Sequence, residues 1–257
     1  MHGPALAPNK LDKVKTLIRR YWDWRSRSFG VDTDKSVMIA DQWESTIQQL
    51  VKDAPGRCAL DIGTGTGQFA VYLARSGFNV TGIDISQGMV TQARRYAASQ
   101  NLDIDFQTGD AEKLGFEDSR FDVVVSRNLL WTLPHPGKAL MEWRRIMKPG
   151  GILVVSDGFW MNHTVRRVHV LAFNLLKSGF RKGSLISLRF FCNYARIQKA
   201  LPFYEGLHIE NASRLLEGAR FKNIFCLDTT CFGFNPYDGK NRIKPKLPSF
   251  FIVQARR

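Results

Sequence analysis

The sequence has few cysteines and no long hydrophobic run. Its four cysteines, Cys58, Cys192, Cys226 and Cys231, are far apart, and none forms a C-x-x-C pair. A disulfide-rich scaffold is thereby excluded, and we expect no metal, a reducing cytoplasmic setting, and cysteines that act as small buried hydrophobic residues. No apolar run approaches the roughly 18 residues of a membrane span, and no secretory signal pattern precedes the first helical stretch.

Acidic residues are unevenly distributed, although the formal net charge of +14 belongs to the whole chain. Residues 57–157 contain equal numbers of acidic and basic side chains, whereas the last hundred residues hold nearly all of the basic excess. Between Gly158 and Tyr204 there are eight Lys or Arg residues and no acid. This asymmetry indicates that the basic segment and the balanced segment have different tasks.

Short apolar runs alternate with helical patterns from residue 58 onward. This alternation predicts an α/β fold with a doubly wound, mostly parallel sheet of seven strands, covered by helices on both faces. The strands are expected at 58–63, 79–84, 104–110, 121–126, 151–157, 221–229 and 249–257, and the helices near 68–76, 87–99, 137–147 and 207–219.

Four segments follow from this pattern. Residues 1–56 form a helical N-terminal segment with helices near 11–29 and 35–52, and residues 57–158 form a Rossmann-like core. Residues 159–204 form a basic helical insertion between the fifth and sixth strands, with helices near 162–177 and 185–200, and residues 205–257 complete the core sheet.

A glycine-rich turn and two acids mark the candidate ligand site. The stretch 59–67, ALDIGTGTG, lies where a strand turns into a helix, and glycine lets a ligand approach the backbone closely. Asp84 ends the second strand, where an acid can accept hydrogen bonds from both hydroxyls of a ribose, and Asp110 follows the third strand. One acid could merely cap a helix, but two acids in register with the glycine turn indicate a nucleoside site.

These motifs resemble those of class I S-adenosylmethionine-dependent methyltransferases. The resemblance covers residues 57–157 through ALDIGTGTG, VTGIDIS (80–86), GDAEKLGFEDSRFDVVVS (109–126) and MKPGGILVV (147–155). The short-loop branch of small-molecule methyltransferases, including those of quinone biosynthesis, is the most similar. LEGARF (216–221) and SFFIVQARR (249–257) resemble that family's last helix and antiparallel last strand, except that Arg220 stands where relatives place glycine.

The resemblance implies S-adenosyl-L-methionine as cofactor and a role for each matching residue. Asp61 and the loop glycines Gly63, Gly65 and Gly67 would hold the methionine end. Asp84 would bind the ribose, with Ile85 against the adenine, and Asp110 with the Ala111 N–H would read the adenine edge. Arg127 and Asn128 would line the sulfonium end by their backbone. The aromatic residues of 21–29 (Tyr21, Trp22, Trp24 and Phe29) would either cover the cofactor as a lid or pack on the core, and of these Tyr21 and Trp22 are expected to bind the cofactor.

The resemblance further implies an enzyme that moves a methyl group by direct in-line transfer to a small-molecule or lipid-like acceptor, with an anionic acceptor among the options. The sequence does not fix a general base; weak candidates are His163, His169, Tyr194, Tyr204 and His208. An NAD-dependent oxidoreductase is a competing class, because Asp84 could hold an NAD ribose, but Gln68 stands where its third glycine belongs. A non-catalytic cofactor-binding protein is a further alternative.

The basic insertion, residues 159–204, allows three roles. Its helices could form a lid over the acceptor pocket, lie on an anionic membrane surface and collect a lipid-like acceptor, or bind RNA for methylation. We favour the lid, with peripheral membrane contact as an addition, because no recognisable RNA-binding module accompanies the core.

Overall fold

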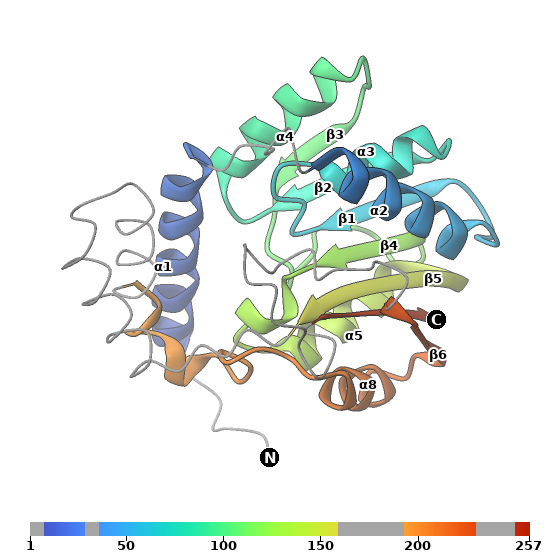
Figure 1. The fold of residues 1–257 in the computed structure, drawn as a ribbon. Helices are drawn as coiled ribbons and strands as arrows, with labels where there is room; N and C mark the ends of the chain where they lie inside the picture. Colours follow the sequence, from blue (N-terminus) through green and yellow to red (C-terminus); the bar gives the residue numbers. More distant parts are fainter. Residues whose placement is uncertain (1–7, 29–35, 159–192, 230–249) are drawn as a thin grey trace.

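The computed structural model describes residues 8–28, 36–158, 193–229 and 250–257, and its centre is a seven-stranded sheet (Figure 1). The strand order is β3-β2-β1-β4-β5-β7-β6. Strands β3, β2, β1, β4 and β5 are parallel neighbours, whereas β7 is antiparallel to both β5 and β6. The predicted α/β class and antiparallel last strand are confirmed. The strands are β1 (Cys58–Ile62), β2 (Asn79–Asp84), β3 (Asp105–Thr108), β4 (Phe121–Arg127), β5 (Met147–Gly158), β6 (Lys222–Leu227) and β7 (Phe250–Arg256).

Helices cover both faces of this sheet, because successive strand residues point to opposite sides. Ala59 packs with α2, α3 and α4, whereas the next residue, Leu60, packs with α5 and α8 on the other face. Both strand residues are fully buried, as expected for the central strand of a sheet covered on two sides. The helices are α2 (Ser36–Val51), α3 (Gln68–Arg75), α4 (Gln87–Ser99), α5 (Pro136–Ile146) and α8 (Ile209–Gly218).

Helix α1 (Pro8–Ser26) stands apart from these two layers, at the edge where the parallel strands end (Figure 1). Val14, Ile18 and Tyr21 recur at helical spacing and pack in a third cluster with Trp131 and with Tyr194. Two short 3-10 helices, η1 (Leu130–Thr132) and η2 (Gln198–Ala200), border this cluster. The cluster therefore closes one side of the carboxyl end of the sheet.

The strand order reverses beside β1, which leads to β2 and β3 on one side and to β4 and β5 on the other. In open α/β sheets a crevice forms at such a reversal, outside the carboxyl ends of the strands. The glycine turn after β1 and the ends of β2 and β4 all lie at this place (Figure 1). The fold alone thus indicates where a ligand site should be sought.

Some expectations differ from the structure in detail. The helix expected over 185–200 does not reach residue 200, because residues 195–197 form a turn before η2, and the helix near 162–177 lies outside the described residues. The prediction of buried cysteines is wrong for Cys226, which is exposed because β6 is the edge strand, and Cys58 is only partly buried. Cys192 and Cys231 lie outside the described residues.

Arg220 shows how helix α8 ends without a glycine at position 220. Its backbone has φ of 63°, the left-handed conformation that glycine adopts without strain. The Arg220 N–H donates to the Glu217 carbonyl, and the Phe221 N–H donates to the Leu216 carbonyl. The usual helix-ending geometry is therefore kept, and the arginine bears the conformational cost.

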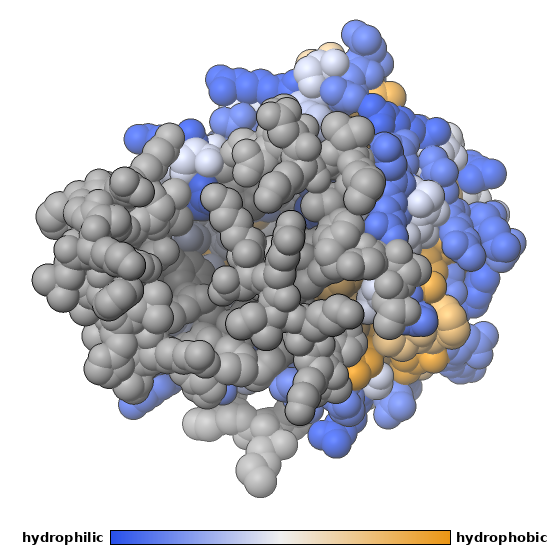
Figure 2. Space-filling model, viewed as in Figure 1, coloured by the Kyte–Doolittle hydropathy of each residue, from blue (hydrophilic) through white to orange (hydrophobic). Residues whose placement is uncertain are grey.

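Figure 2 shows a mainly hydrophilic surface on the described part of the face in view, with hydrophobic residues gathered at the lower right, where Figure 1 places β6 and α8. Phe225 of β6 is 54% exposed, which is consistent with its place on the edge strand. Among the described helices, none has the length and apolar character needed to cross a membrane.

Candidate functional site

The turn between β1 and α3 builds the first wall of the site. Gly63, Gly65 and Gly67 all have positive φ, at 70°, 55° and 84°. The carboxylate of Asp61, in β1 just before the turn, fixes the turn to the start of α3. Its Oδ2 accepts hydrogen bonds from the Thr64 hydroxyl at 2.6 Å and from the Ala70 N–H at 3.1 Å. A methyl group on Gly65 would meet no atom closer than the Gly63 carbonyl oxygen at 4.0 Å. At Gly65 the turn therefore presents bare backbone to open space.

Asp84, the last residue of β2, fixes the same turn from the neighbouring strand. Its Oδ2 accepts from the Gly65 N–H at 3.0 Å, and its Oδ1 accepts from the Ser86 N–H at 2.9 Å. A carboxylate has about four acceptor positions, so each oxygen keeps capacity for a further donor. The two backbone bonds orient the carboxylate, and a ligand with two adjacent hydroxyls could use the remaining capacity.

Asp110 lies beyond the end of β3, at the far end of the same crevice. Its Oδ1 accepts from the Glu112 N–H at 2.9 Å, and its Oδ2 pairs with the Lys15 ammonium at 2.6 Å. The next residue, Ala111, is buried, and its carbonyl oxygen accepts from the indole N–H of Trp143 at 2.8 Å. The loop after β3 is thus tied to helix α1 on one side and to the core on the other.

Arg127 and Asn128, at the end of β4, form the opposite end of the crevice. The Arg127 guanidinium donates to the Gln68 amide oxygen at 2.7 Å and lies 4.7 Å from the centre of the Phe69 ring. Asn128 has φ of 55°, and its N–H donates to the Ser156 carbonyl at 2.8 Å. Its side-chain oxygen is buried and has no hydrogen-bond partner among the described residues. This end therefore combines a fixed positive charge with an amide oxygen that can accept a hydrogen bond.

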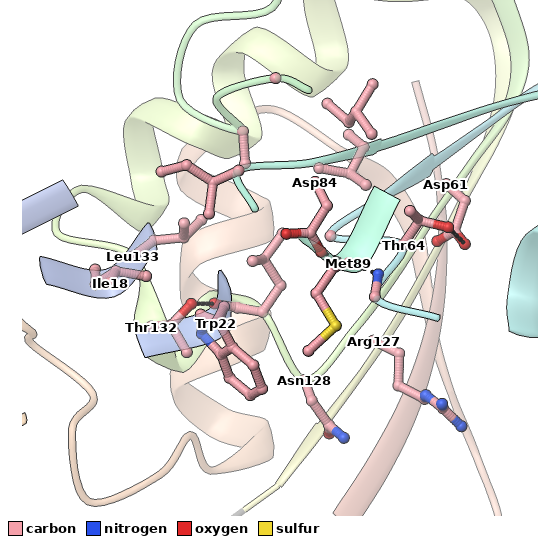
Figure 3. Close-up of a pocket in the computed structure, with 18 of the residues that line it drawn as sticks. Ile18, Trp22, Asp61, Thr64, Asp84, Met89, Arg127, Asn128, Thr132 and Leu133 are labelled. Atoms are coloured by element: carbon pink, nitrogen blue, oxygen red, sulfur yellow. Dashed lines mark hydrogen bonds between the residues drawn. The ribbon is translucent and has the colours of Figure 1, made fainter. Parts of the chain in front are cut away.

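These elements enclose one pocket of about 1120 Å³, including its opening to solvent. In Figure 3 the α1 residues Ile18 and Trp22 lie on the side of the pocket opposite Asp61, with Asp84 between them. Ten of the twelve residues expected to bind the cofactor line this pocket: Trp22, Asp61, Gly63, Gly65, Asp84, Ile85, Asp110, Ala111, Arg127 and Asn128.

The other two expected residues lie just outside its lining. Gly67 immediately precedes α3, and its N–H donates a hydrogen bond to the Thr64 carbonyl. Tyr21 is 4% exposed and meets the Tyr194 ring edge-on, with ring centres 5.3 Å apart. Of the aromatic residues near the end of α1, Trp22 therefore lines the pocket while Tyr21 packs behind it.

The candidates for a general base are not gathered in the pocket. Tyr194 and Tyr204 are buried side by side in the third cluster, the one that packs against α1, with ring centres 6.4 Å apart. His208 is exposed and precedes the first turn of α8, while His163 and His169 lie outside the described residues. Within the described part of the chain, the pocket lining contains no histidine.

Several lining residues were missed by sequence reasoning, above all Lys15 of α1. Lys15, Ile18 and Trp22 lie three and four residues apart, so they share one face of the helix and all line the pocket. The apolar members of this face were visible in the sequence. A lysine among surface charges gives no signal of its own, because only the tertiary structure brings Asp110 and Glu112 next to it.

Burial changes the acidity of the two strand-end acids. It raises the pKa of Asp84 to about 6, although hydrogen bonds from the Ser86 and Gly65 N–H groups oppose the shift. Burial likewise raises the pKa of Asp61 to about 6, against the hydrogen bond from Thr64 and the charge of Arg127. Both carboxylates are therefore ionised at neutral pH and become protonated in mildly acidic solution.

The sequence of the core matches a known domain family. The family model described as "Methyltransferase domain" matches residues 60–155, which contain the glycine turn and the ends of β2, β3 and β4. The resemblance stated from the motifs is thus confirmed at the level of this domain match, which covers residues 60–155.

Two curated relatives extend the match. The chain is 38% identical over 148 residues to a demethylmenaquinone methyltransferase of Renibacterium salmoninarum. The aligned region covers 57% of this chain and 61% of that protein. The chain is 28% identical over 169 residues to a ubiquinone biosynthesis O-methyltransferase of Caulobacter vibrioides, covering 63% of this chain and 66% of that protein. The match thus spans less than two thirds of each relative.

Solved structures share the fold across more of the chain. A magnesium protoporphyrin IX methyltransferase of Synechocystis with bound S-adenosylhomocysteine is 20% identical, with a TM-score of 0.58, covering 95% of this chain and 99% of that one. The [4+2]-cyclase SpnF is 21% identical, with a TM-score of 0.59, covering 100% of this chain and 99% of that one. At such identities the likeness shows the fold alone, and the activity has to be argued from the site.

Proposed function

We propose that this chain is an S-adenosylmethionine-dependent methyltransferase that acts on a small-molecule or lipid-like acceptor. The single observation that supports this most strongly is the convergence of three neighbouring strand ends on one pocket. The glycine turn after β1, Asp84 after β2 and Asp110 beyond β3 all line it. The methyltransferase domain model matches the residues that form this convergence, which supports assigning the pocket to S-adenosylmethionine.

The donor and acceptor set of the pocket fits S-adenosylmethionine. Gly65 leaves open space where a side chain would project, so a ligand can approach the backbone of the turn. Asp84 is oriented by two backbone N–H groups and keeps acceptor capacity for two ribose hydroxyls. Asp110 offers a carboxylate to an adenine amino group at the other end.

Each part of the chain would then hold one part of the cofactor. The turn at Gly63 and Gly65, with the Arg127 charge beside it, would take the methionine carboxylate, because that charge is fixed by Gln68 and Phe69. Asp84 would take the ribose. Ile85 and Ala111 would flank the adenine, and Asp110 would accept a hydrogen bond from the adenine amino group.

The cofactor supplies an electrophilic methyl group on a sulfonium, and the chain's own residues position and desolvate the reactants. Trp22 and Ile18 of α1 exclude water from one side of the pocket. Asn128 places a buried amide oxygen at the end of β4, where it could accept a hydrogen bond from an acceptor hydroxyl or amine. Direct transfer needs the acceptor atom in line with the breaking bond, which is a task of positioning.

The acceptor class rests on the relatives and on the character of this end of the pocket. One curated relative is named as a demethylmenaquinone methyltransferase and the other as an O-methyltransferase of ubiquinone biosynthesis. Trp22 and Leu129, which are neutral, lie with Asn128 in the lining, as suits a flat or apolar acceptor. We propose that the basic insertion, residues 159–204, of which 159–192 lie outside the described residues, serves the acceptor and contacts an anionic membrane surface from which a lipid-like acceptor is drawn.

The direct test is binding followed by transfer. Calorimetry should show S-adenosylhomocysteine binding in the micromolar range, and incubation with methyl-labelled S-adenosylmethionine and a demethylated quinone should give labelled quinone. Heat with NAD but none with S-adenosylhomocysteine would contradict the proposal. Label in total RNA but not in quinone would retain the methyltransferase and overturn the acceptor class.

The raised pKa values predict that cofactor binding depends on pH. A protonated Asp84 loses acceptor capacity for ribose hydroxyls, so affinity is highest well above pH 6 and falls as pH drops through that value. If only the ionised form binds, the apparent affinity at pH 5 is about tenfold below that at pH 7.5, because the binding-competent fraction falls by that factor. Calorimetry with S-adenosylhomocysteine across pH 5–8 measures this. Asp84→Asn should flatten the profile, and a wild-type profile without slope would refute the prediction.

A further inference from the structure

Helix α1 is fastened across the pocket at two polar points. Near its middle, the Lys15 ammonium lies 2.6 Å from Asp110 Oδ2 and 2.7 Å from Glu112 Oε2. Two turns later, Asp23 Oδ1 accepts from the Ser86 hydroxyl at 2.7 Å and from the Gly88 N–H at 3.1 Å. Ile18 and Trp22, which line the pocket (Figure 3), lie between Lys15 and Asp23 along the helix.

The first fastening point is a partly buried ion triad. The Lys15 side chain is 17% exposed and that of Glu112 only 2%, while Glu112 Oε1 accepts from the His135 N–H at 2.6 Å. Among the described residues, Lys15 is the one cation within 4.0 Å of either carboxylate. Burial lowers the pKa of Lys15, but its hydrogen bonds with Asp110 and Glu112 raise it further, so the group is charged. Without Lys15 the buried Glu112 charge would lack a counter-ion.

The second fastening point holds α1 against the start of α4. Ser86 precedes α4, and its hydroxyl also accepts from the Met89 N–H, so Asp23 extends the cap of that helix. A side chain at Gly88 would meet the Ser26 hydroxyl oxygen at 2.3 Å. Glycine at this position therefore lets α1 approach α4 without displacing the Ser26 side chain.

The Lys15 contacts reach the residue that would read the cofactor's base. Asp110 has two oxygens: one is held by the Glu112 N–H and the other by Lys15. These two partners fix the plane of the carboxylate and direct its remaining lone pairs. The ion that ties α1 in place is thus also the ion that orients Asp110.

We propose that Lys15 is a cofactor-positioning residue, which orients Asp110 toward the adenine amino group and couples the docking of α1 to occupancy of the pocket. This inference rests on the proposed function, because it assigns the adenine to Asp110. It implies that loss of the Lys15 contact weakens both the docking of α1 and the orientation of Asp110.

The test compares Lys15→Met with Lys13→Met, which removes the same charge from an exposed position two residues earlier on α1. We expect Lys15→Met to bind S-adenosylhomocysteine roughly tenfold or more weakly, since a charge-assisted contact that orients Asp110 is lost. Its α1 amides should exchange hydrogen faster in the ligand-free protein. Lys13→Met should match the wild type in both measurements, and Lys15→Arg should restore protection of α1 because it keeps the charge.

A base-specific measurement separates positioning from mere support of the fold. The wild type should prefer S-adenosylhomocysteine to S-inosylhomocysteine, in which the amino group is replaced by oxygen, and Lys15→Met should reduce that preference. Unchanged affinity, or unchanged exchange of α1, in a folded Lys15→Met protein would overturn the inference. If the wild type bound no S-adenosylhomocysteine, the proposed function would fail, while exchange of α1 in the ligand-free protein would still test the tether.

Discussion

Replacing Asp84 with alanine is expected to weaken binding of S-adenosylhomocysteine by about 1–3 kcal/mol, which corresponds to roughly 5- to 150-fold in affinity. Two losses contribute. The ribose hydroxyls would lose a charged acceptor, and the Gly65 and Ser86 N–H groups would lose the carboxylate that fixes the glycine turn. Isothermal calorimetry at pH 7.5 gives the affinity, and circular dichroism establishes that the variant is folded.

The matched controls separate these contributions. Asp103→Ala removes an exposed acid just before β3, at the other end of the sheet, and should leave affinity unchanged. Asp84→Asn keeps one oxygen acceptor without the charge and should fall between the wild type and the alanine variant. A folded Asp84→Ala protein with wild-type affinity would remove this residue from the site and with it the ribose assignment.

Replacing Trp143 with alanine is expected to give the largest loss of stability, about 3–5 kcal/mol in the free energy of unfolding. Trp143 is fully buried between α5 and the sheet, so truncation leaves a large cavity. Its indole N–H also donates to the Ala111 carbonyl at 2.8 Å, and that oxygen would lose its donor. Urea denaturation followed by fluorescence or circular dichroism measures the change.

Two further variants identify the cause. Trp143→Phe fills most of the cavity and removes only the hydrogen bond, so it should cost about 1–2 kcal/mol and loosen the loop that carries Asp110 and Ala111. Met141→Ala, on the same helix but 57% exposed, should lie within about 0.5 kcal/mol of the wild type. Equal losses for the alanine variants at 141 and 143 would contradict the core position of Trp143.

The core could be predicted from the sequence because its signals are local. Helices α3 and α4 begin where expected, at Gln68 and Gln87, because the signals that start them, the glycine turn and the Ser86 cap, immediately precede them in the sequence. The residues of the pocket that follow strand ends were predicted for the same reason. A parallel sheet brings its carboxyl ends to one edge, so the acid after each strand has a foreseeable place.

Contacts made by α1 could not be predicted in this way. The hydrophobic spacing of Ile18 and Tyr21 indicates a buried helical face, but it does not say against which surface. Lys15 is separated from Asp110 by 95 residues, and Asp23 from Ser86 by 63. No local rule connects such pairs, so the division between Trp22 in the pocket and Tyr21 behind it required the structure.

The position of β7 has a consequence for how the protein folds. This strand lies between β5 and β6 and pairs with both, although about a hundred residues separate Ile152 from its partner Arg256. The edge of β5 that faces β7 therefore stays without its hydrogen-bond partners until a distant part of the chain reaches it. Closing so long a loop costs conformational entropy before the strand pairing compensates that cost. During synthesis on the ribosome, strands β1 to β5 can assemble while β7, which pairs with the free edge of β5, has yet to emerge. We expect the unsealed β5 edge to be the place where a folding intermediate recruits a chaperone or aggregates.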